Sequence, residues 1–334
     1  MKTILVSIFS LFLLMSCKNE KASNEAETNN DVVDASTFEV VEEAVLSAGK
    51  LYRISNFESD FVSARNIDVW VPENYSETIT YATLYVHDGQ MLFDSTTTWN
   101  KQEWKVDETI TSLMQENKIK PTIVVGMWNV TEDRHTDYFP QQPWESLSDA
   151  TRQAILEENQ AHSKSRFQKD INSDNYIRFI TEEVLPLVED NFNVSRNLKN
   201  RAVAGSSMGG LISWYTVLEK PSVFGSAICM STHWPGAKPI ENNPIPDAFF
   251  SYIKEKLPEV PGNHKFYFDF GTETLDSFYP AFEEDVNAVF ASKNYKESSF
   301  RNLKFEGTGH SELSWNQRFH IPLVFAFQVE TLID

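Results

Sequence analysis

The sequence is poor in cysteine and in basic residues, and it has no apolar run long enough to span a bilayer. Only two cysteines, Cys17 and Cys229, occur in 334 residues. The chain after Cys17 therefore cannot form an internal disulfide, and packing must stabilise it. Lys and Arg total 29 against 48 Asp and Glu, a formal net charge of -19. That charge repels nucleic acid and anionic lipid, so neither is expected as a partner.

The N-terminus has the features of a lipoprotein signal. Lys2 is followed by an uncharged apolar run, Ile4 to Met15, that is too short for a stable transmembrane helix. The run leads into Leu14-Met15-Ser16-Cys17, which resembles a bacterial lipobox. We expect residues 1–16 to be a signal peptide and a lipid on Cys17 to anchor the protein in the cell envelope, in the periplasm or at the outer-membrane surface. An ordinary signal peptide with an incidental cysteine is the alternative.

The rest of the chain divides into a tether and one domain. Residues 17–37 are mostly small, polar or acidic, and such a segment buries too little apolar surface to offset the entropy of ordering it. We expect a flexible tether there. Residues 38–334 fall within the size range of one large α/β domain and show no internal repeat.

Short runs rich in Val, Ile, Tyr and Phe alternate with longer helical patterns along this domain, which predicts a mostly parallel central sheet with helices on both faces. The early part, residues 38–74, favours antiparallel edge strands, whereas residues 137–173 are expected to be an irregular lid, substrate wall or surface insertion. The expected strands are Ile67–Val71, Thr83–Val86, Thr122–Gly126, Ala202–Ala204, Ser226–Met230, Lys265–Phe270 and Leu303–Glu306. The expected helices are Glu103–Gln115, Tyr176–Asn191, Gly209–Leu218, Pro280–Ser292 and Trp315–Val329.

The segment Gly205-Ser206-Ser207-Met208-Gly209 carries the first chemical signal. It joins an expected strand to an expected helix, and a nucleophilic serine needs such a tight strand-to-helix turn to project from the sheet. The two glycines leave room for the strained backbone. Ser207 is therefore the candidate nucleophile, and the Met208 N–H at the helix N-terminus is a candidate oxyanion donor.

A serine needs a base and an acid, which are expected later in the chain. His310 is the candidate base, because it follows an expected strand in a glycine-rich loop and precedes the last helix. The acid should follow the strand Lys265–Phe270, where Asp276 is preferred and Glu273 is the alternative. The second oxyanion donor is expected in the turn Tyr85-Val86-His87-Asp88-Gly89-Gln90, where Gly89 permits a sharp turn that directs the Gln90 N–H; a simple strand-ending turn is the alternative.

The chain contains four characteristic segments in this order: His-Asp-Gly-Gln, Gly-Ser-Ser-Met-Gly-Gly, Asp-Phe-Gly-Thr-Glu-Thr-Leu-Asp and Gly-Thr-Gly-His-Ser-Glu. From about Leu46 onward the chain resembles the esterase family that includes esterase D, enterochelin esterases, mycolyltransferase antigens and feruloyl or acetylxylan esterases. The resemblance implies an α/β-hydrolase fold and ester cleavage with no metal and no organic cofactor. It also implies Ser207 as nucleophile, His310 as base, an acid between Gly271 and Asp276, and Gln90 as the second oxyanion donor.

The expected function is that of a serine carboxylic-ester hydrolase acting on a small-molecule or glycan ester, with carbohydrate-linked acetyl or feruloyl esters as the first choice. A siderophore lactone esterase and an acyltransferase are the enzymatic alternatives. A ligand-binding lipoprotein that retains the fold is the non-enzymatic one. Trp99, Trp104, Trp128 and Trp234 can stack on sugar or feruloyl rings, but tryptophan is equally common in cores.

Overall fold

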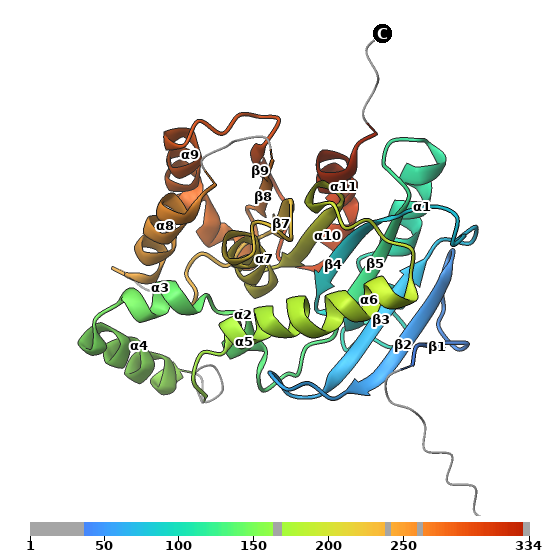
Figure 1. Ribbon diagram of the computed structural model, residues 1–334. Coiled ribbons are helices and arrows are strands. Elements are labelled where there is room, and N and C mark those ends of the chain that lie inside the picture. Colours follow the sequence, from blue (N-terminus) through green and yellow to red (C-terminus); the bar gives the residue numbers. More distant parts are fainter. Residues whose placement is uncertain (1–36, 163–168, 238–241, 259–262, 330–334) are drawn as a thin grey trace, which may run out of the picture. The chain divides into compact units, whose positions relative to one another are not determined.

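A computed structural model of the chain describes residues 37–162, 169–237, 242–258 and 263–329. Within them a nine-stranded sheet has the order β1-β2-β3-β5-β4-β6-β7-β8-β9 (Figure 1). The strands are β1 (Glu39–Val40), β2 (Lys50–Phe57), β3 (Arg65–Val71), β4 (Ala82–His87), β5 (Thr122–Met127), β6 (Arg201–Ser206), β7 (Ser226–Met230), β8 (Lys265–Gly271) and β9 (Phe300–Phe305). The expected signal peptide, Cys17 and all of the tether but residue 37 lie outside the described residues.

The sheet is antiparallel at its N-terminal edge and parallel elsewhere. β1 pairs with β2, β2 with β3 and β3 with β5 in antiparallel register, and these early strands lie at one edge in blue in Figure 1. All neighbours from β5 through β4 and β6 to β9 are parallel. The carboxyl ends of β4, β6 and β8 therefore meet at one edge of the sheet, where the candidate site residues follow them.

Helices cover both faces of the sheet, as expected. One apolar cluster joins one face to the segment from α5 to α6 and to α7, α8 and α9, and a second joins the other face to α1, α10 and α11. The helices are α1 (Val106–Gln115), α2 (Arg134–Tyr138), α3 (Gln141–Ser146), α4 (Asp149–His162), α5 (Ser173–Arg178), α6 (Leu185–Asn191), α7 (Met208–Glu219), α8 (Ile245–Lys256), α9 (Glu283–Ser292), α10 (Glu312–Arg318) and α11 (His320–Phe327). None of the helices in the described part of the chain is long and apolar enough to cross a membrane.

Three expectations about elements were wrong. The stretch 137–173 is not simply irregular, because it contains α3 and α4. Helix α8 was missed, although Ile245, Phe249 and Ile253 give it a buried stripe at helical spacing. The last expected helix is two helices, α10 and α11, because Pro322 has no N–H to donate to the carbonyl of Arg318.

Strand β6 and helix α7 approach each other closely at the turn that joins them. A Cβ atom on Gly205 would lie 2.7 Å from the backbone carbon and oxygen of Gly209, so only glycine fits at position 205. A Cβ on Gly209 would meet its nearest neighbour, the Cβ of His87, at 3.5 Å, which is ordinary van der Waals contact. The two glycines of the motif therefore carry different constraints.

We expect Gly205→Ala to lower the free energy of unfolding by about 1–3 kcal/mol, because the backbone of the turn must shift to accept the methyl group. Gly209→Ala is the matched control. It should leave stability unchanged or raise it by up to about 1 kcal/mol, since alanine favours a helix more than glycine does. Urea unfolding of the two variants measures the difference, and an equal loss in both would contradict the packing argument.

Candidate active site

Ser207 occupies a strained turn between β6 and α7. Its backbone has φ 58 and ψ -119, which a non-glycine residue adopts only when the surrounding structure holds it there. Two backbone hydrogen bonds hold it: the Ser207 N–H donates to the Met230 carbonyl at 2.9 Å, and the His233 N–H donates to the Ser207 carbonyl at 3.2 Å. The motif thus forms the turn that the sequence predicted, and the end of β7 and the segment after it hold its geometry.

The two candidate oxyanion donors lie at the starts of helical turns. Met208 is the first residue of α7, so its N–H has no acceptor within the helix. Gln90 lies in the short 3-10 turn Gly89–Met91, and its side-chain oxygen accepts the Asn129 N–H at 3.2 Å. The role expected of Gly89 needs correction, because the left-handed residue is Asp88, with φ 59. Gly89 is needed instead for its close approach to β5, where a Cβ would lie 2.6 Å from the backbone of Gly126.

The histidine and the preferred acid are in contact. His310 Nδ1 lies 2.6 Å from Asp276 Oδ1, and the Asp276 side chain is completely buried. A carboxylate can only accept, so Nδ1 carries the proton and Nε2 remains for a second partner. Glu273, the alternative acid, is exposed, and its backbone N–H donates to the Thr308 carbonyl at 3.0 Å. Of the two carboxylates, the structure brings Asp276 to His310.

The second oxygen of Asp276 has two donors of its own. The Ser231 hydroxyl donates to Oδ2 at 2.6 Å and the Gly271 N–H at 2.7 Å. Burial alone would raise the pKa of Asp276, but the bonds from His310, Ser231 and Gly271 outweigh it and lower the pKa below its ordinary value. The carboxyl group therefore stays ionised while it orients the imidazole.

Behind Ser231 lies a buried polar network that the sequence interpretation missed. The Ser231 hydroxyl accepts from Trp315 Nε1 and from Arg318 Nη2, both at 2.9 Å. Arg318 Nη2 also donates to Asp269 Oδ1 at 2.9 Å. A signal for Arg318 was present, because it lies three residues after Trp315, at a position where helical spacing predicts an apolar side chain. For Ser231 we find no such signal.

Ser207 and His310 open into the same cavity of about 600 Å³. Asp88 lines it too and is held by a bidentate pair with Arg134, in which Nε and Nη2 each lie 2.7 Å from a carboxylate oxygen, and by Asn129 Nδ2 at 2.7 Å. Burial would raise the pKa of Asp88, but Arg134 and Asn129 lower it below its ordinary value. The charge of Arg134 is thereby neutralised at the cavity wall.

The four tryptophans singled out from the sequence have different surroundings. Trp234 is buried among aromatic rings, and Trp104 packs against Trp315 and Phe319. Trp128 stacks under the Arg53 guanidinium and donates Nε1 to Asp68. Trp99 alone of the four is highly exposed, at 83%, and it lines the cavity that contains Ser207.

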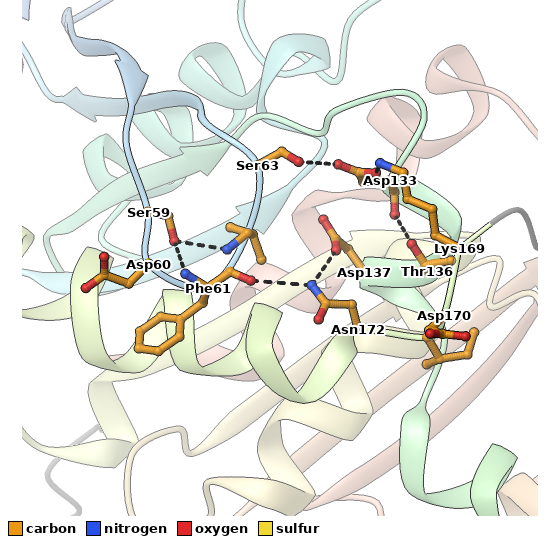
Figure 2. Close-up of a pocket in the computed structure, with 12 residues that line it drawn as sticks. Ser59, Asp60, Phe61, Ser63, Asp133, Thr136, Asp137, Lys169, Asp170 and Asn172 are labelled. Carbon is orange, nitrogen blue, oxygen red and sulfur yellow. Dashed lines mark hydrogen bonds and ion pairs between the residues drawn. The ribbon is translucent and has the colours of Figure 1, made fainter.

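A second hollow, of about 550 Å³, lies between the turn 59–63 and the region around α2 (Figure 2). Its buried carboxylates already have partners: Asp133 binds Ser63 and Lys169, and Asp137 binds Asn172 and Arg65. Among the described residues, no group of three or more His, Cys, Asp or Glu side chains is arranged to hold a metal ion. The Ser207 cavity is therefore the better candidate for chemistry.

Comparison with known proteins places these features in a family. The sequence matches the family described as "Putative esterase" over residues 60–319. It is 27% identical over 172 residues to the uncharacterised protein YbbA of Bacillus subtilis, a match covering 51% of this chain and 58% of that protein. The chain thus spans well under two thirds of that relative's length.

Solved structures show the same fold. The enterobactin esterase FES from Shigella flexneri superposes with a TM-score of 0.58 at 17% identity, covering 84% of this chain and 59% of the other. The CE1 ferulic acid esterase from Anaeromyces mucronatus superposes with a TM-score of 0.56 at 18% identity, covering 84% and 91%. With its α/β-hydrolase fold and the family match over most of its length, the chain belongs to this esterase family.

Proposed function

We propose that this protein is a serine carboxylic-ester hydrolase that acts through an acyl-enzyme on Ser207. The observation that carries the proposal is the joint placement of a strained serine turn and a carboxylate-bound histidine on one cavity. A buried acid that fixes the histidine tautomer is what a serine nucleophile requires of its base. A ligand-binding protein has no need of this arrangement.

The proposed reaction proceeds in two acyl-transfer steps. Ser207 Oγ attacks the ester carbonyl while its proton passes to His310 Nε2, and the Met208 and Gln90 N–H groups stabilise the oxyanion. The tetrahedral intermediate collapses, the C–O bond to the alcohol breaks, and His310 returns the proton to the leaving alcohol. Water then attacks the acyl-enzyme by the same route, releasing the carboxylic acid and regenerating Ser207. The ionised Asp276 stabilises the imidazolium in both steps.

For the substrate we propose a neutral carbohydrate-linked acetyl or feruloyl ester. The structural likeness to a ferulic acid esterase supports this class. The likeness to an enterobactin esterase would support a siderophore lactone instead. Charge favours the first, because iron-bound catecholates are anionic whereas this chain carries a net charge of -19, and the Arg134 charge at the cavity is already neutralised by Asp88.

We also propose that the enzyme works in the cell envelope, anchored by a lipid on Cys17. The support is the sequence alone: an uncharged apolar run that ends at a lipobox-like cysteine and a polar segment after it. A tether of that kind would let the domain reach polymeric substrates near a membrane surface.

Replacing the nucleophile should abolish covalent labelling. We expect Ser207→Ala to lose both ester hydrolysis and reaction with a fluorophosphonate probe, because the variant lacks the hydroxyl that shares a cavity with the proposed base, His310. Ser213→Ala, a buried serine of α7 whose hydroxyl donates to the Gly209 carbonyl, is the matched control and should still be labelled. Labelling is read by intact-protein mass spectrometry, and a modified Ser207→Ala protein would refute the assignment.

Replacing each candidate acid by its isosteric amide distinguishes Asp276 from Glu273. Asp276→Asn should lower kcat about 10⁴-fold, because an amide at this position favours the wrong histidine tautomer. Glu273→Gln should leave kcat within about twofold, since the Glu273 side chain is exposed and Asp276 is the carboxylate that binds His310. Steady-state kinetics on a p-nitrophenyl ester compare them. A larger loss in Glu273→Gln than in Asp276→Asn would reverse the assignment.

A further inference from the structure

The loop between Phe93 and Val106 presents an exposed tryptophan at the mouth of the Ser207 cavity. Trp99 is 83% exposed, far more than the other large apolar side chains of the described residues. Indole is among the largest apolar groups a protein can bury, so its exposure beside a cavity is unusual for a residue that serves only packing. The Trp99 side chain is therefore free of packing neighbours on most of its surface and can contact a ligand at the mouth of the cavity.

Side-chain hydrogen bonds hold the backbone of this loop in place. Asp94 caps it by accepting the Thr96 N–H at 2.8 Å and the Val45 N–H at 3.1 Å. Lys101 Nζ donates to the Thr96 carbonyl at 2.6 Å, across the base of the turn that carries Trp99. A group that is already ordered loses little conformational entropy when it binds a ligand.

A further hydrogen bond joins the loop to the side of the cavity that carries His310. Asn100 Nδ2, next to Trp99, donates to Glu312 Oε2 at 2.8 Å, and Glu312 lies two residues after His310. Trp99, Glu312, His310 and Ser207 all line the same cavity. The backbone that carries the indole is thus linked to the segment that carries His310.

We propose that Trp99 forms a subsite that stacks on a sugar ring of the alcohol part of the ester. The inference rests on the proposed function and names the part of the substrate that is recognised. The ester carbonyl must lie at Ser207 inside the cavity, whereas the saccharide extends toward solvent, where the exposed indole lies. The apolar C–H face of a pyranose matches the face of an indole.

Charge and polarity at the rim fit an uncharged polyol. Glu312 offers a carboxylate for sugar hydroxyls, and Gln90 and Asn129 add amide groups on the same cavity wall. Arg134 is the only Lys or Arg among the described residues that line the cavity, and Asp88 neutralises it. An anionic ring would meet Glu312 with no free cation to compensate, so a neutral sugar is selected.

The test compares two acetyl esters that differ in the alcohol: an O-acetylated xylo-oligosaccharide and the acyclic 2-hydroxyethyl acetate. Trp99→Leu should raise KM for the saccharide ester roughly three- to tenfold, the equivalent of one aromatic stacking contact, and leave the acyclic ester unchanged. Trp99→Phe, which keeps a stacking ring, should lie close to the wild type. Equal KM values for Trp99→Leu and wild type on the saccharide ester would overturn the subsite.

A second measurement separates the subsite from catalysis. Unesterified xylo-oligosaccharide should change the tryptophan fluorescence of the wild type, and Trp99→Leu should lose that saturable signal. Saccharide binding through Trp99 with no hydrolysis of either ester would refute the proposed function and keep the subsite. Hydrolysis of both esters with identical wild-type and Trp99→Leu fluorescence titrations would refute the subsite alone.

A second inference rests on independent observations, the hydrogen bonds of Ser231. Its hydroxyl is completely buried and accepts two donors, Trp315 Nε1 and Arg318 Nη2. These occupy both lone pairs of the oxygen, so its hydrogen has one remaining direction, toward Asp276 Oδ2 at 2.6 Å. The geometry points to Ser231 as a positioning residue that keeps the Asp276 carboxylate from rotating away from His310.

Ser231→Ala should lower kcat roughly 10- to 100-fold and leave KM within about twofold, because the acid is displaced while the cavity wall is kept. The rate of fluorophosphonate labelling should fall by the same factor, since labelling needs the activated serine but no deacylation. Ser226→Ala, a buried serine at the other end of β7, is the matched control and should leave both rates unchanged.

Ser231→Cys keeps the shape and a weaker donor, so its kcat should lie between those of Ser231→Ala and the wild type. It also keeps the test decisive if the alanine variant is poorly folded. A kcat within about twofold of wild type in the folded variant, or a loss confined to KM, would overturn the positioning role.

Discussion

The hydrogen bonds on the buried carboxylate of Asp276 are the contacts on which the rest of the site depends. One oxygen takes the proton of His310, and the other takes donors from Ser231 and Gly271. These partners come from the loop after β9, the end of β7 and the end of β8, so one side chain joins three neighbouring strands. Burial alone would favour its neutral form, and the donors keep it charged. Without them it would neither orient nor stabilise an imidazolium.

The cavity combines this fixed chemistry with a polar wall that carries little unpaired charge. Asp88 and Arg134 neutralise each other, and Glu312 is held by Asn100. In a chain with a net charge of -19, such a wall favours neutral substrates over anionic ones. Trp99 adds a flat apolar surface that is far more exposed than Trp104 and Trp315, which line the same cavity. Together these features support the proposed sugar-linked ester over a charged siderophore.

Local patterns predicted the sheet well and some helices poorly. Strand β7 has the expected bounds, Ser226–Met230, because a short apolar strand between turn residues leaves few alternatives. Helix α8 was missed because the prolines near its start resemble loop signals, although they occupy the first turn, where a helix tolerates them. Helices α3 and α4 lie in a polar stretch whose composition concealed them. Local patterns therefore predict an element reliably only where composition and hydrophobic periodicity agree.

The sequence by itself determined the fold class, the serine turn, the histidine and two candidate acids, because each depends on residue type and order along the chain. Only the tertiary structure separated Asp276 from Glu273, since both lie in one short segment and differ in which side chain reaches His310. It also showed that position 89 requires glycine because its backbone lies close to β5, and not because of the turn geometry. The pairing of Ser231 with Arg318, 87 positions apart, likewise needed the fold. Such contacts form only when the parallel strands bring their carboxyl ends together, so they cannot be predicted from distance along the chain.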